Sequence, residues 1–248
     1  MKRDLAVVIM AAGKGTRMKN PDIAKVMYAI NGKPMIDYVI DLAMALDSRR
    51  IVAIVGWQKD AVIRHLEQSG RPVMFAEQTP QLGTGHAVMQ AEPILKEYDG
   101  NVLVLSGDVP TLTAGTMRRL IDHHDASNVV ATVLTAEPAD AAGYGRILRA
   151  ADGSVVGIVE HKDASEQQRR IREINSGIYV FDSRRLFAGL KHITPSNVQK
   201  EYYLTDVFEY FWRNNLKVAA VKASEPSEIQ GINNLEQLEE ARSIMSER

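Results

Sequence analysis

The sequence predicts an α/β fold: a mixed, mostly parallel sheet flanked by helices, with a smaller β-rich lobe. Short apolar runs rich in Val and Ile alternate with longer amphipathic stretches as far as about residue 127. Alternation of strand and helix in this rhythm is typical of a parallel sheet covered on both faces. From residue 128 the strand patterns follow one another with few helices between them, which indicates an antiparallel or mixed extension.

Individual elements follow from the same patterns. In the first part, we expect buried strands at residues 5–10, 51–55, 73–76 and 102–106, and helices at residues 34–46, 59–68 and 85–96. In the second part, we expect strands at residues 129–135, 145–148, 155–159, 177–181 and 218–221, and helices around 208–214 and at 235–245. Because no linker separates the two parts, we expect one domain over residues 1–248. Its expected divisions are a lobe at about 1–127, a second lobe at 128–232 and a C-terminal helix at 233–248.

The composition limits the classes of function. The 248 residues carry 30 basic and 31 acidic side chains, for a net charge of −1. Binding to nucleic acid through its phosphates usually needs a basic excess, so a small-molecule substrate is favoured. The absence of cysteine excludes disulfides and thiolate metal sites. The apolar run at residues 5–12 is too short to span a membrane and precedes no cleavage-site pattern, so we expect a cytoplasmic protein with no membrane partner.

A glycine-rich turn, "AAGKGTRM", follows the first expected strand. It does not fit the dinucleotide pattern G-x-G-x-x-G, because Met18 stands where the third glycine belongs. It does not fit the P-loop either, because Lys14 is followed by Gly15. What remains is a tight backbone that can approach an anion, with Arg17 and Lys25 available to offset its charge. An ordinary strand-to-helix turn with solvated cations is the alternative.

Two further strand ends carry polar groups, and ligands of open parallel sheets bind beyond the carboxyl ends of strands. "SGDVP" places Asp108 where a nucleotide-bound Mg²⁺ needs an oxygen ligand, with a helix cap or Asx turn as the alternative. "EQTPQLGTGHA" opens an expected helix whose amides suit an anion or a base carbonyl. Gln78 offers both a donor and an acceptor to a pyrimidine edge. We interpret His86 as a structural histidine rather than a general base.

Polar residues between the later strands complete the candidates. Glu160 and Asn175 are isolated polar residues at expected strand edges, where they suit sugar hydroxyls or backbone amides. We interpret the histidine pair at 123–124 as a helix end near the negative pole of the helix dipole. In "GINNLEQLEEA", either Asn233 or Asn234 is expected to cap the last helix.

Together these segments resemble the bacterial N-acetylglucosamine-1-phosphate uridyltransferases, within the sugar-phosphate nucleotidyltransferase family. The similarity runs from about residue 5 to residue 238 and includes "AAGKGTRM", Lys25, "QLGTGHA", "GDVP", "GYGRI", "GIVEHKDA", "EINSGIYVF", "EYYLTD" and "GINN". The first motif and the "GD" strand end mark the superfamily. The other motifs in combination are more specific, and they indicate the GlcNAc-1-phosphate branch rather than the glucose branch.

The resemblance implies a Rossmann-like nucleotidyltransferase fold and the formation of UDP-GlcNAc and pyrophosphate from UTP and GlcNAc-1-phosphate. It implies Arg17 and Lys25 as catalytic residues, Asp108 and Asn233 as Mg²⁺ ligands, and Gly145, Glu160 and Asn175 as sugar-binding residues. It implies a nucleotide site formed by Ala11, Ala12, Gly13, Gln78, Gly83 and Thr84. The spacing favours Gln78 over Gln81 on the base. In-line attack on the α-phosphorus needs no general base, because a phosphate monoester oxygen is already a nucleophile.

The chain departs from the family pattern at three points. Ala24 stands where the family usually has proline before the lysine, and "MKNPDIA" holds one extra residue. Ser106 stands where many relatives have tyrosine. No hexapeptide repeat is present, so we expect no left-handed β-helix domain, no acetyltransferase activity and no trimer of the kind that this domain forms. Other oligomeric states, and whether the chain is a stand-alone enzyme or an excised domain, are left open.

Three alternative functions remain open from the sequence. One is a nucleotidyltransferase for another hexose-1-phosphate or nucleotide, such as UTP with glucose-1-phosphate. A second is a non-catalytic sugar-nucleotide-binding module; Arg17, Lys25 and Asp108 argue against it, because a pure binder needs no charges for a triphosphate. A third is a glycosyltransferase of similar fold, which would usually show a D-x-D motif where "SGDVP" has a single aspartate.

Overall fold

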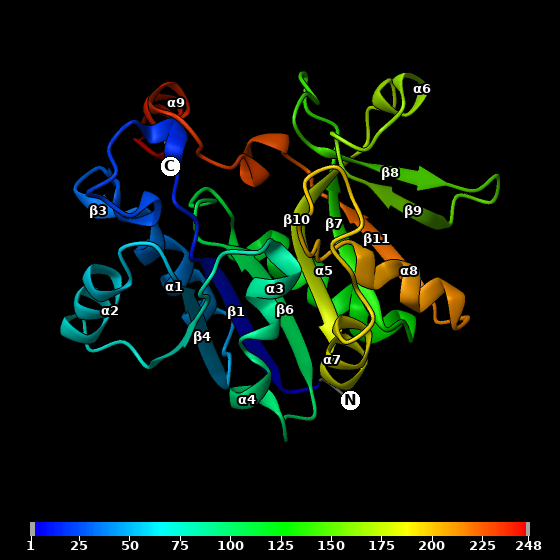
Figure 1. Ribbon diagram of the computed structural model, residues 1–248, viewed down its shortest axis with the longest axis horizontal. Helices are drawn as coiled ribbons and strands as arrows, with labels where there is room; N and C mark the ends of the chain where they lie inside the picture. Colours follow the sequence, from blue (N-terminus) through cyan, green and yellow to red (C-terminus); the bar gives the residue numbers. More distant parts are fainter. Residues whose placement is uncertain (1–2, 247–248) are drawn as a thin grey trace.

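A twisted central sheet organises the molecule (Figure 1). The computed structural model describes residues 3–246, and within this range nine strands join in one sheet. The main path of the sheet runs in the order β11 (Val218–Lys222), β7 (Ala131–Ala136), β10 (Ile174–Asp182), β6 (Asn101–Ser106), β1 (Leu5–Ala11), β4 (Arg50–Val55) and β5 (Val73–Glu77). β8 (Gly145–Arg149) and β9 (Val155–Val159) branch from β10 as an antiparallel hairpin.

The sheet is mixed and mostly parallel, which confirms the predicted fold class. β10 runs antiparallel to β6 and β7, while the other neighbouring pairs on the main path are parallel. A register shift interrupts the pairing of β10 with β7 between Asn175 and Tyr179. The residues of β10 before this irregularity, Ile174 and Asn175, pair with β7 on one side and with β8 on the other, so this part of the strand joins the β8–β9 hairpin to the main sheet.

Helices cover both faces of the sheet, which explains the nearly continuous apolar run of β1. Val7 and Ile9 face a core that includes residues of α1 (Met35–Ala45), α2 (Lys59–Gln68) and α5 (Ala114–Ser127). Ala6 and Val8 face a second core, formed with α3 (Thr84–Met89), α4 (Glu92–Leu95), α7 (Ser183–Leu190) and α8 (Asp206–Arg213). Between residues 3 and 246, no helix is long and apolar enough to cross a bilayer.

The predicted helix at 85–96 is wrong as one continuous element. The chain forms α3, turns at Gln90 and Ala91, and then starts α4 with Pro93 in its first turn. Proline has no N–H to donate and disfavours the helical conformation of the residue before it, so the break falls where a proline can begin a helix. The expectation of few helices after residue 128 is also incomplete, because α7 follows β10 directly.

The C-terminal helix α9 (Leu235–Ser246) returns to the N-terminal part of the chain (Figure 1). It packs on the small hairpin of β2 (Ala29–Ile30) and β3 (Lys33–Pro34) through a core that contains Ile30, Met35 and Leu238. Asn234 Oδ1 accepts a hydrogen bond of 2.8 Å from Gln237 N and so caps this helix, as one of the two predicted alternatives had it. This packing brings the residues just before α9 to the carboxyl ends of the strands.

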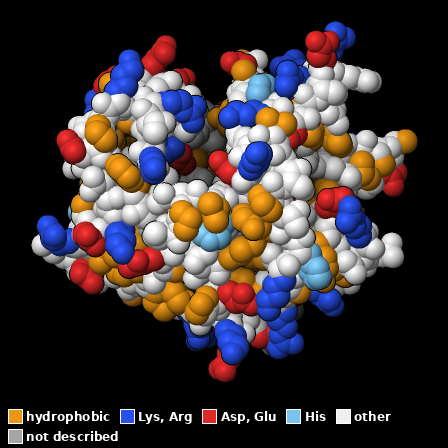
Figure 2. Space-filling view, viewed as in Figure 1, with side chains coloured by type: hydrophobic (Ala, Val, Ile, Leu, Met, Phe, Trp, Pro, Cys, Tyr) orange, Lys and Arg blue, Asp and Glu red, His pale blue; other side chains and the backbone are white. Residues whose placement is uncertain are grey.

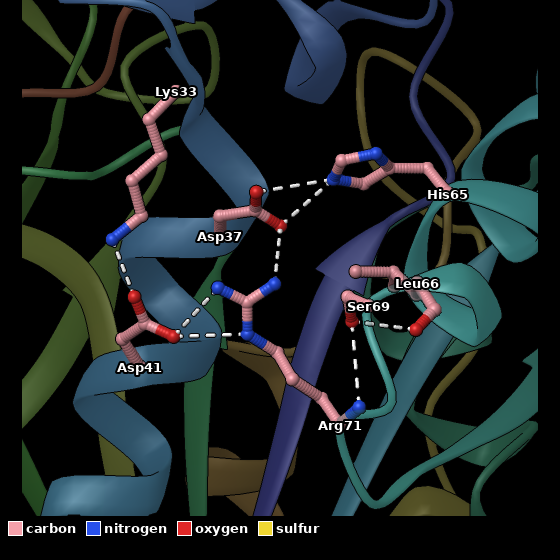
Figure 3. Close-up of polar contacts among 7 residues, drawn as sticks. All are labelled: Lys33, Asp37, Asp41, His65, Leu66, Ser69 and Arg71. Carbon is pink, nitrogen blue, oxygen red and sulfur yellow. Dashed lines mark hydrogen bonds and ion pairs between the residues drawn. The ribbon is translucent and has the colours of Figure 1, made fainter.

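A network of charged side chains ties α1 to α2 (Figure 3). The buried carboxylate of Asp37 contacts His65 Nε2 at 2.9 Å and Arg71 Nη1 at 3.3 Å. Arg71 also binds Asp41 at 2.9 Å, and Lys33 forms an ion pair with the same carboxylate. Burial disfavours the charged form of Asp41, but hydrogen bonds from Lys33 and Arg71 outweigh it and hold the pKa of Asp41 below its usual value. We therefore assign this network to stability rather than to the site described next.

Candidate active site

The carboxyl ends of the parallel strands surround a cavity of about 270 Å³, here called the strand-end pocket. All six residues predicted for the nucleotide site line it: Ala11, Ala12, Gly13, Gln78, Gly83 and Thr84. Lys25 and Asp108 lie on its wall as well. The structure thus brings the end of β1, the segment after β5 and the segment after β6 to one place, as the topology of a parallel sheet requires.

Arg17, Lys25, Asp108 and Asn233 meet beside this pocket and are here called the charged cluster. Arg17 Nη2 and Lys25 Nζ each donate a hydrogen bond of 2.9 Å to Asn233 Oδ1. Lys25 Nζ also forms an ion pair with Asp108 Oδ2, and both of these side chains are mostly buried. The two residues predicted as catalytic and the two predicted as metal ligands therefore lie in direct contact.

Local backbone geometry explains how the glycine-rich turn reaches Lys25. Gly15 has a φ of 60°, in the left-handed region, and begins the short 3-10 helix η1 (Thr16–Met18). A Cβ on Gly15 would lie only 2.6 Å from Lys25 Cβ, so a side chain at this position would push the turn away from the lysine. Met18, which is buried, anchors the turn in the core beneath α9.

Asn233 reaches the cluster through contacts made by its neighbours. Ile232 N donates a hydrogen bond of 2.9 Å to the carbonyl of Asp108, which ties the two segments together. Asn233 N donates to Gln237 Oε1 at 2.8 Å, and Asn233 Nδ2 donates to Gly231 O at 3.1 Å. Its Nδ2 is thereby turned away and Oδ1 faces the two basic side chains, so the orientation of the amide is determined.

The oxygen atoms of Asp108 and Asn233 suit a divalent cation. Asp108 Oδ2 and Asn233 Oδ1 both bind Lys25 Nζ, so the protein already accommodates a positive charge between them. Carboxylate and amide oxygens are ligands that Mg²⁺ accepts, and nucleotide phosphates and water usually complete its shell. The described residues 3–246 contain no group of three or more His, Cys, Asp or Glu side chains that could hold a metal ion. A pair of oxygens is enough for an ion that is shared with a nucleotide.

A second cavity, here called the polar pocket, adjoins the charged cluster at Arg17 and has a volume of about 520 Å³. Arg17 lines it together with Glu160, His161 and Tyr203, among others. The molecular surface is hollowed in this region, between the part that carries α9 and the part that carries α6 (Glu166–Arg169), β8 and β9 (Figure 2). Members of the charged cluster therefore line both cavities.

The three residues predicted to bind sugar are also neighbours. Gly145 of β8 pairs with Asn175 of β10, and a Cβ on Gly145 would lie 3.3 Å from Glu160 Oε2. Burial raises the pKa of Glu160, and a 3.2 Å hydrogen bond from Thr205 Oγ1 partly offsets this effect. The side chain of Asn175 donates 2.7 Å to Tyr179 Oη and accepts 3.1 Å from Gly177 N. Asn175 therefore stabilises the irregularity in β10 through these two hydrogen bonds, in addition to any contact with a ligand.

Gln78 is buried and its amide is held from two sides. Its Nε2 donates 2.9 Å to Gly83 O and lies 3.2 Å from His86 Nδ1. The other ring nitrogen of His86 lies 3.3 Å from Gln90 Nε2, and burial lowers the pKa of His86. A histidine held between two amides supports Gln78, in line with the structural role predicted for it. Gln81 lines the same pocket, so both glutamines remain within reach of a base.

Sequence patterns gave no role to the "EYYLTD" segment, although the structure places it against the strand-end pocket. Gly85 N donates 2.7 Å to Tyr202 O, and Tyr202 N donates 2.8 Å to Leu82 O. Leu204 N donates 3.0 Å to Thr84 Oγ1. The segment thus holds the start of α3 in place. The sequence signal that could have indicated this role was the presence of "EYYLTD" among the motifs shared with the family.

The two histidines near the end of α5 lie in different environments. The pair does lie in the last part of that helix, as predicted. His124, however, is buried, with Nδ1 2.9 Å from Thr132 Oγ1, and burial lowers its pKa to about 4. A histidine that is neutral at pH 7 carries no charge to interact with the helix dipole. We therefore interpret His124 as a buried side chain that packs between α5 and β7 and contacts Thr132.

The fold and the paired pockets around a charged cluster define an enzyme of the nucleotidyl-transferring α/β class. Residues 6–225 match the family described as nucleotidyl transferase, and the chain belongs to this family. A putative glucose-1-phosphate thymidylyltransferase from Bacillus anthracis, solved in complex with a sucrose, matches with a TM-score of 0.77 at 18% identity, over 97% of this chain and 94% of that chain. The structure of a UDP-glucose pyrophosphorylase complexed with UDP-glucose matches with the same TM-score of 0.77 and the same identity of 18%. This match covers 98% of this chain and 99% of that chain. At these identities the matches establish the fold.

Curated relatives are closer in sequence. The bifunctional protein GlmU of Geobacillus sp. (strain WCH70) is 49% identical over 241 residues, which are 97% of this chain and 52% of the relative. The bifunctional protein GlmU of Pelotomaculum thermopropionicum (strain DSM 13744 / JCM 10971 / SI) is 46% identical over 245 residues, which are 99% of this chain and 53% of the relative. The chain thus spans about half the length of the curated relatives it matches. These relatives confirm the family that the motifs indicated.

Proposed function

We propose that this protein joins UTP and GlcNAc-1-phosphate to form UDP-GlcNAc and pyrophosphate. The observation that carries the proposal is that members of the charged cluster line both cavities: Lys25 and Asp108 line the strand-end pocket, and Arg17 lines the polar pocket. Such an arrangement suits a reaction in which two phosphate-bearing substrates, one in each cavity, meet the same group of charged side chains. The motifs shared with N-acetylglucosamine-1-phosphate uridyltransferases, and the similarity to the proteins named GlmU, support the choice of sugar and base.

Each pocket has a part in this proposal. The nucleotide occupies the strand-end pocket, with its phosphates along the backbone of Ala11 to Gly13 and its uracil at Gln78. The sugar occupies the polar pocket beside Glu160, near Gly145 and Asn175. Residues up to about 127 then form a nucleotide-binding lobe, and residues 128–232 form a sugar-binding lobe. Because UTP and sugar phosphates are cytosolic metabolites, a cytoplasmic location belongs to the same proposal.

The chemical step is an in-line displacement at the α-phosphorus of UTP. An oxygen of the sugar phosphate forms the new bond to phosphorus, and the bond from that phosphorus to the bridging oxygen breaks, so pyrophosphate leaves with the electron pair. Arg17 and Lys25 offset the charge that grows on the departing group. The attacking oxygen is already ionised at neutral pH, so the step needs no general base. The protein contributes position and charge.

Asp108 and Asn233 are the residues that would hold Mg²⁺. When bound, the ion supplies further positive charge to the triphosphate. Lys25 Nζ binds both residues, so its ammonium and such an ion would compete for the same two oxygen atoms.

The test is a pyrophosphate-release assay of the whole chain with Mg²⁺. UTP, dTTP and CTP are each paired with GlcNAc-1-phosphate, glucose-1-phosphate and glucosamine-1-phosphate. We expect the highest kcat/KM for UTP with GlcNAc-1-phosphate. Faster turnover with another pair would replace the proposed substrates, and absence of turnover with every pair would favour a non-catalytic binding module.

A further inference from the structure

The loop between Arg17 and Lys25 is an exposed segment that has to hold two basic side chains in place. Its residues 19–23 are exposed to solvent, and it contains the extra residue noted against the family pattern. Arg17 lies in η1 and Lys25 begins the next 3-10 helix, η2 (Lys25–Met27). Because the loop buries little of its own surface, its conformation depends on contacts from neighbouring elements.

Two side chains beyond the end of β4 bind the middle of this loop. Trp57 Nε1 donates a hydrogen bond of 3.0 Å to the carbonyl oxygen of Pro21. Gln58 Nε2 donates to the same oxygen at 3.2 Å. A carbonyl oxygen has two lone pairs and accepts both bonds, so this single atom joins the loop to two consecutive residues.

Trp57 is itself fixed to the wall of the strand-end pocket. Its backbone N–H donates 3.1 Å to the carbonyl of Ala12, at the end of β1. Lys14 Nζ lies 5.1 Å from the centre of the indole ring, on the other part of the glycine-rich turn. Trp57 therefore contacts the segment before Arg17 through Ala12 and Lys14, and the segment after Arg17 through Pro21.

We propose that Trp57, assisted by Gln58, is a positioning residue that clamps the loop and so aligns Arg17 and Lys25 with the triphosphate. Neither side chain belongs to the charged cluster, so the effect on chemistry is indirect. The clamp itself is independent of the substrate. Its catalytic consequence rests on the proposed function, because the loop carries both basic residues of that mechanism.

The clamp is tested first without any substrate. Trp57→Phe keeps an aromatic ring for Lys14, although a smaller one, and removes the N–H that binds Pro21. Trypsin cuts after Lys14, Arg17 and Lys19, so brief proteolysis of the native chain followed by mass spectrometry reports how often the loop opens. One hydrogen bond lost corresponds to an opening about 5-fold more frequent. We expect cleavage to accelerate by about that factor in Trp57→Phe, and further when Gln58→Ala is added.

The matched control is Trp212→Phe, the same change at the second tryptophan of the chain, which lies on α8 and packs against Phe208. This control should leave loop cleavage unchanged. Equal cleavage of Trp57→Phe and the unsubstituted protein would overturn the clamp, whatever the activity.

The kinetic test separates positioning from folding. If Arg17 and Lys25 act on the departing pyrophosphate, Trp57→Phe should lower kcat, by at most about 5-fold, and leave KM for GlcNAc-1-phosphate within about twofold. An unchanged kcat despite faster loop cleavage would overturn the positioning role and leave a purely structural clamp. If the unsubstituted protein fails to release pyrophosphate from UTP and GlcNAc-1-phosphate, the proposed function fails, and the proteolysis comparison still decides whether the clamp exists.

Discussion

Lys25 Nζ lies 2.9 Å from Asn233 Oδ1, although 208 positions separate the two residues in the chain. The same ammonium forms an ion pair with Asp108 just beyond the end of β6. One lysine thus links the loop after β1, the end of a central strand and the entrance to the last helix. Its ammonium also binds both of the oxygen atoms that are proposed to bind a metal ion. The ammonium and a metal ion should therefore compete for this position, and the competition can be measured.

Lys25→Met should strengthen binding of a divalent cation while it weakens catalysis. Removal of the ammonium leaves Asp108 and Asn233 without their shared positive partner, so a cation binds there with less competition. We expect Mn²⁺ affinity, measured by electron paramagnetic resonance without nucleotide, to rise ~10-fold. We expect kcat to fall by ~10²–10³, the usual effect of removing one charge contact to a transition state.

Lys59→Met is the matched control for this experiment. Lys59 pairs with Glu77 on the surface, outside the charged cluster, so its loss should change neither Mn²⁺ affinity nor kcat. Weaker or unchanged Mn²⁺ binding in Lys25→Met would show that the two oxygens are not the metal ligands.

Gly145→Ala should affect the sugar substrate selectively. The added methyl group would lie 3.2 Å from Val159 O and 3.3 Å from Glu160 Oε2, so the glutamate has to shift. We expect KM for GlcNAc-1-phosphate to rise about 10-fold and KM for UTP to stay within twofold, both measured by pyrophosphate release. Gly115→Ala on α5 serves as the control, because the nearest atom to the new methyl group would be Thr113 Oγ1 at 4.0 Å, an ordinary contact distance. A rise in KM for UTP alone would contradict the assignment of this region to the sugar.

The sequence was sufficient to predict most of the sheet, because β1 and its neighbours are buried on both faces and are therefore apolar throughout. It was not sufficient for α7. Asp182 ends β10 and at once caps α7, its side chain accepting 2.9 Å from Arg185 N, so no turn residues separate strand from helix. The break between α3 and α4 was foreseeable from Pro93, but the apolar spacing on either side of it obscured the signal.

The candidate site was predictable in part for a similar reason. The carboxyl ends of parallel strands share one edge, which brings Ala12, Gln78 and Asp108 together without further information. Asn233 joins them only because α9 packs on the β2–β3 hairpin, a tertiary contact that local patterns do not encode. Trp57 was missed because its function depends on a hydrogen bond to a backbone carbonyl 36 positions away, and any residue can provide a carbonyl.

Arg71→Met should destabilise the fold without altering the site. Arg71 binds the carboxylates of Asp37 and Asp41, and its loss leaves the buried Asp37 with His65 as its partner in the network drawn in Figure 3. Removing one partner of a largely buried pair is costly, so we expect the free energy of unfolding in urea to fall by about 2 kcal/mol. The exposed pair of Arg213 with Glu209 provides the contrast: Arg213→Met should cost at most about 0.5 kcal/mol. Equal effects would mean that the network contributes little.

His124 should make the free energy of unfolding depend on pH between about 4 and 6.5. A histidine with the same pKa in the folded and unfolded states would have no such effect. Burial lowers its pKa to about 4, and the nearby Asp125 only partly opposes this effect. In the unfolded chain the pKa returns to about 6.5. Between these two values the unfolded state binds more protons than the folded state, so the free energy of unfolding rises with pH. The contribution of neutral His124 is thus fully present above pH 6.5 and is lost as the pH falls toward 4.

The size of this effect follows from the separation of the two pKa values, which corresponds to about 3 kcal/mol between pH 6.5 and pH 4. Carboxylates also titrate near the lower limit, so the informative quantity is the difference between proteins. We expect urea unfolding of His124→Gln to show a smaller loss of stability over this range than the unsubstituted protein, by up to that amount. His123→Gln, at the exposed neighbouring position, should retain the full loss. If the two variants lose stability equally on acidification, then His124 is not the group that titrates.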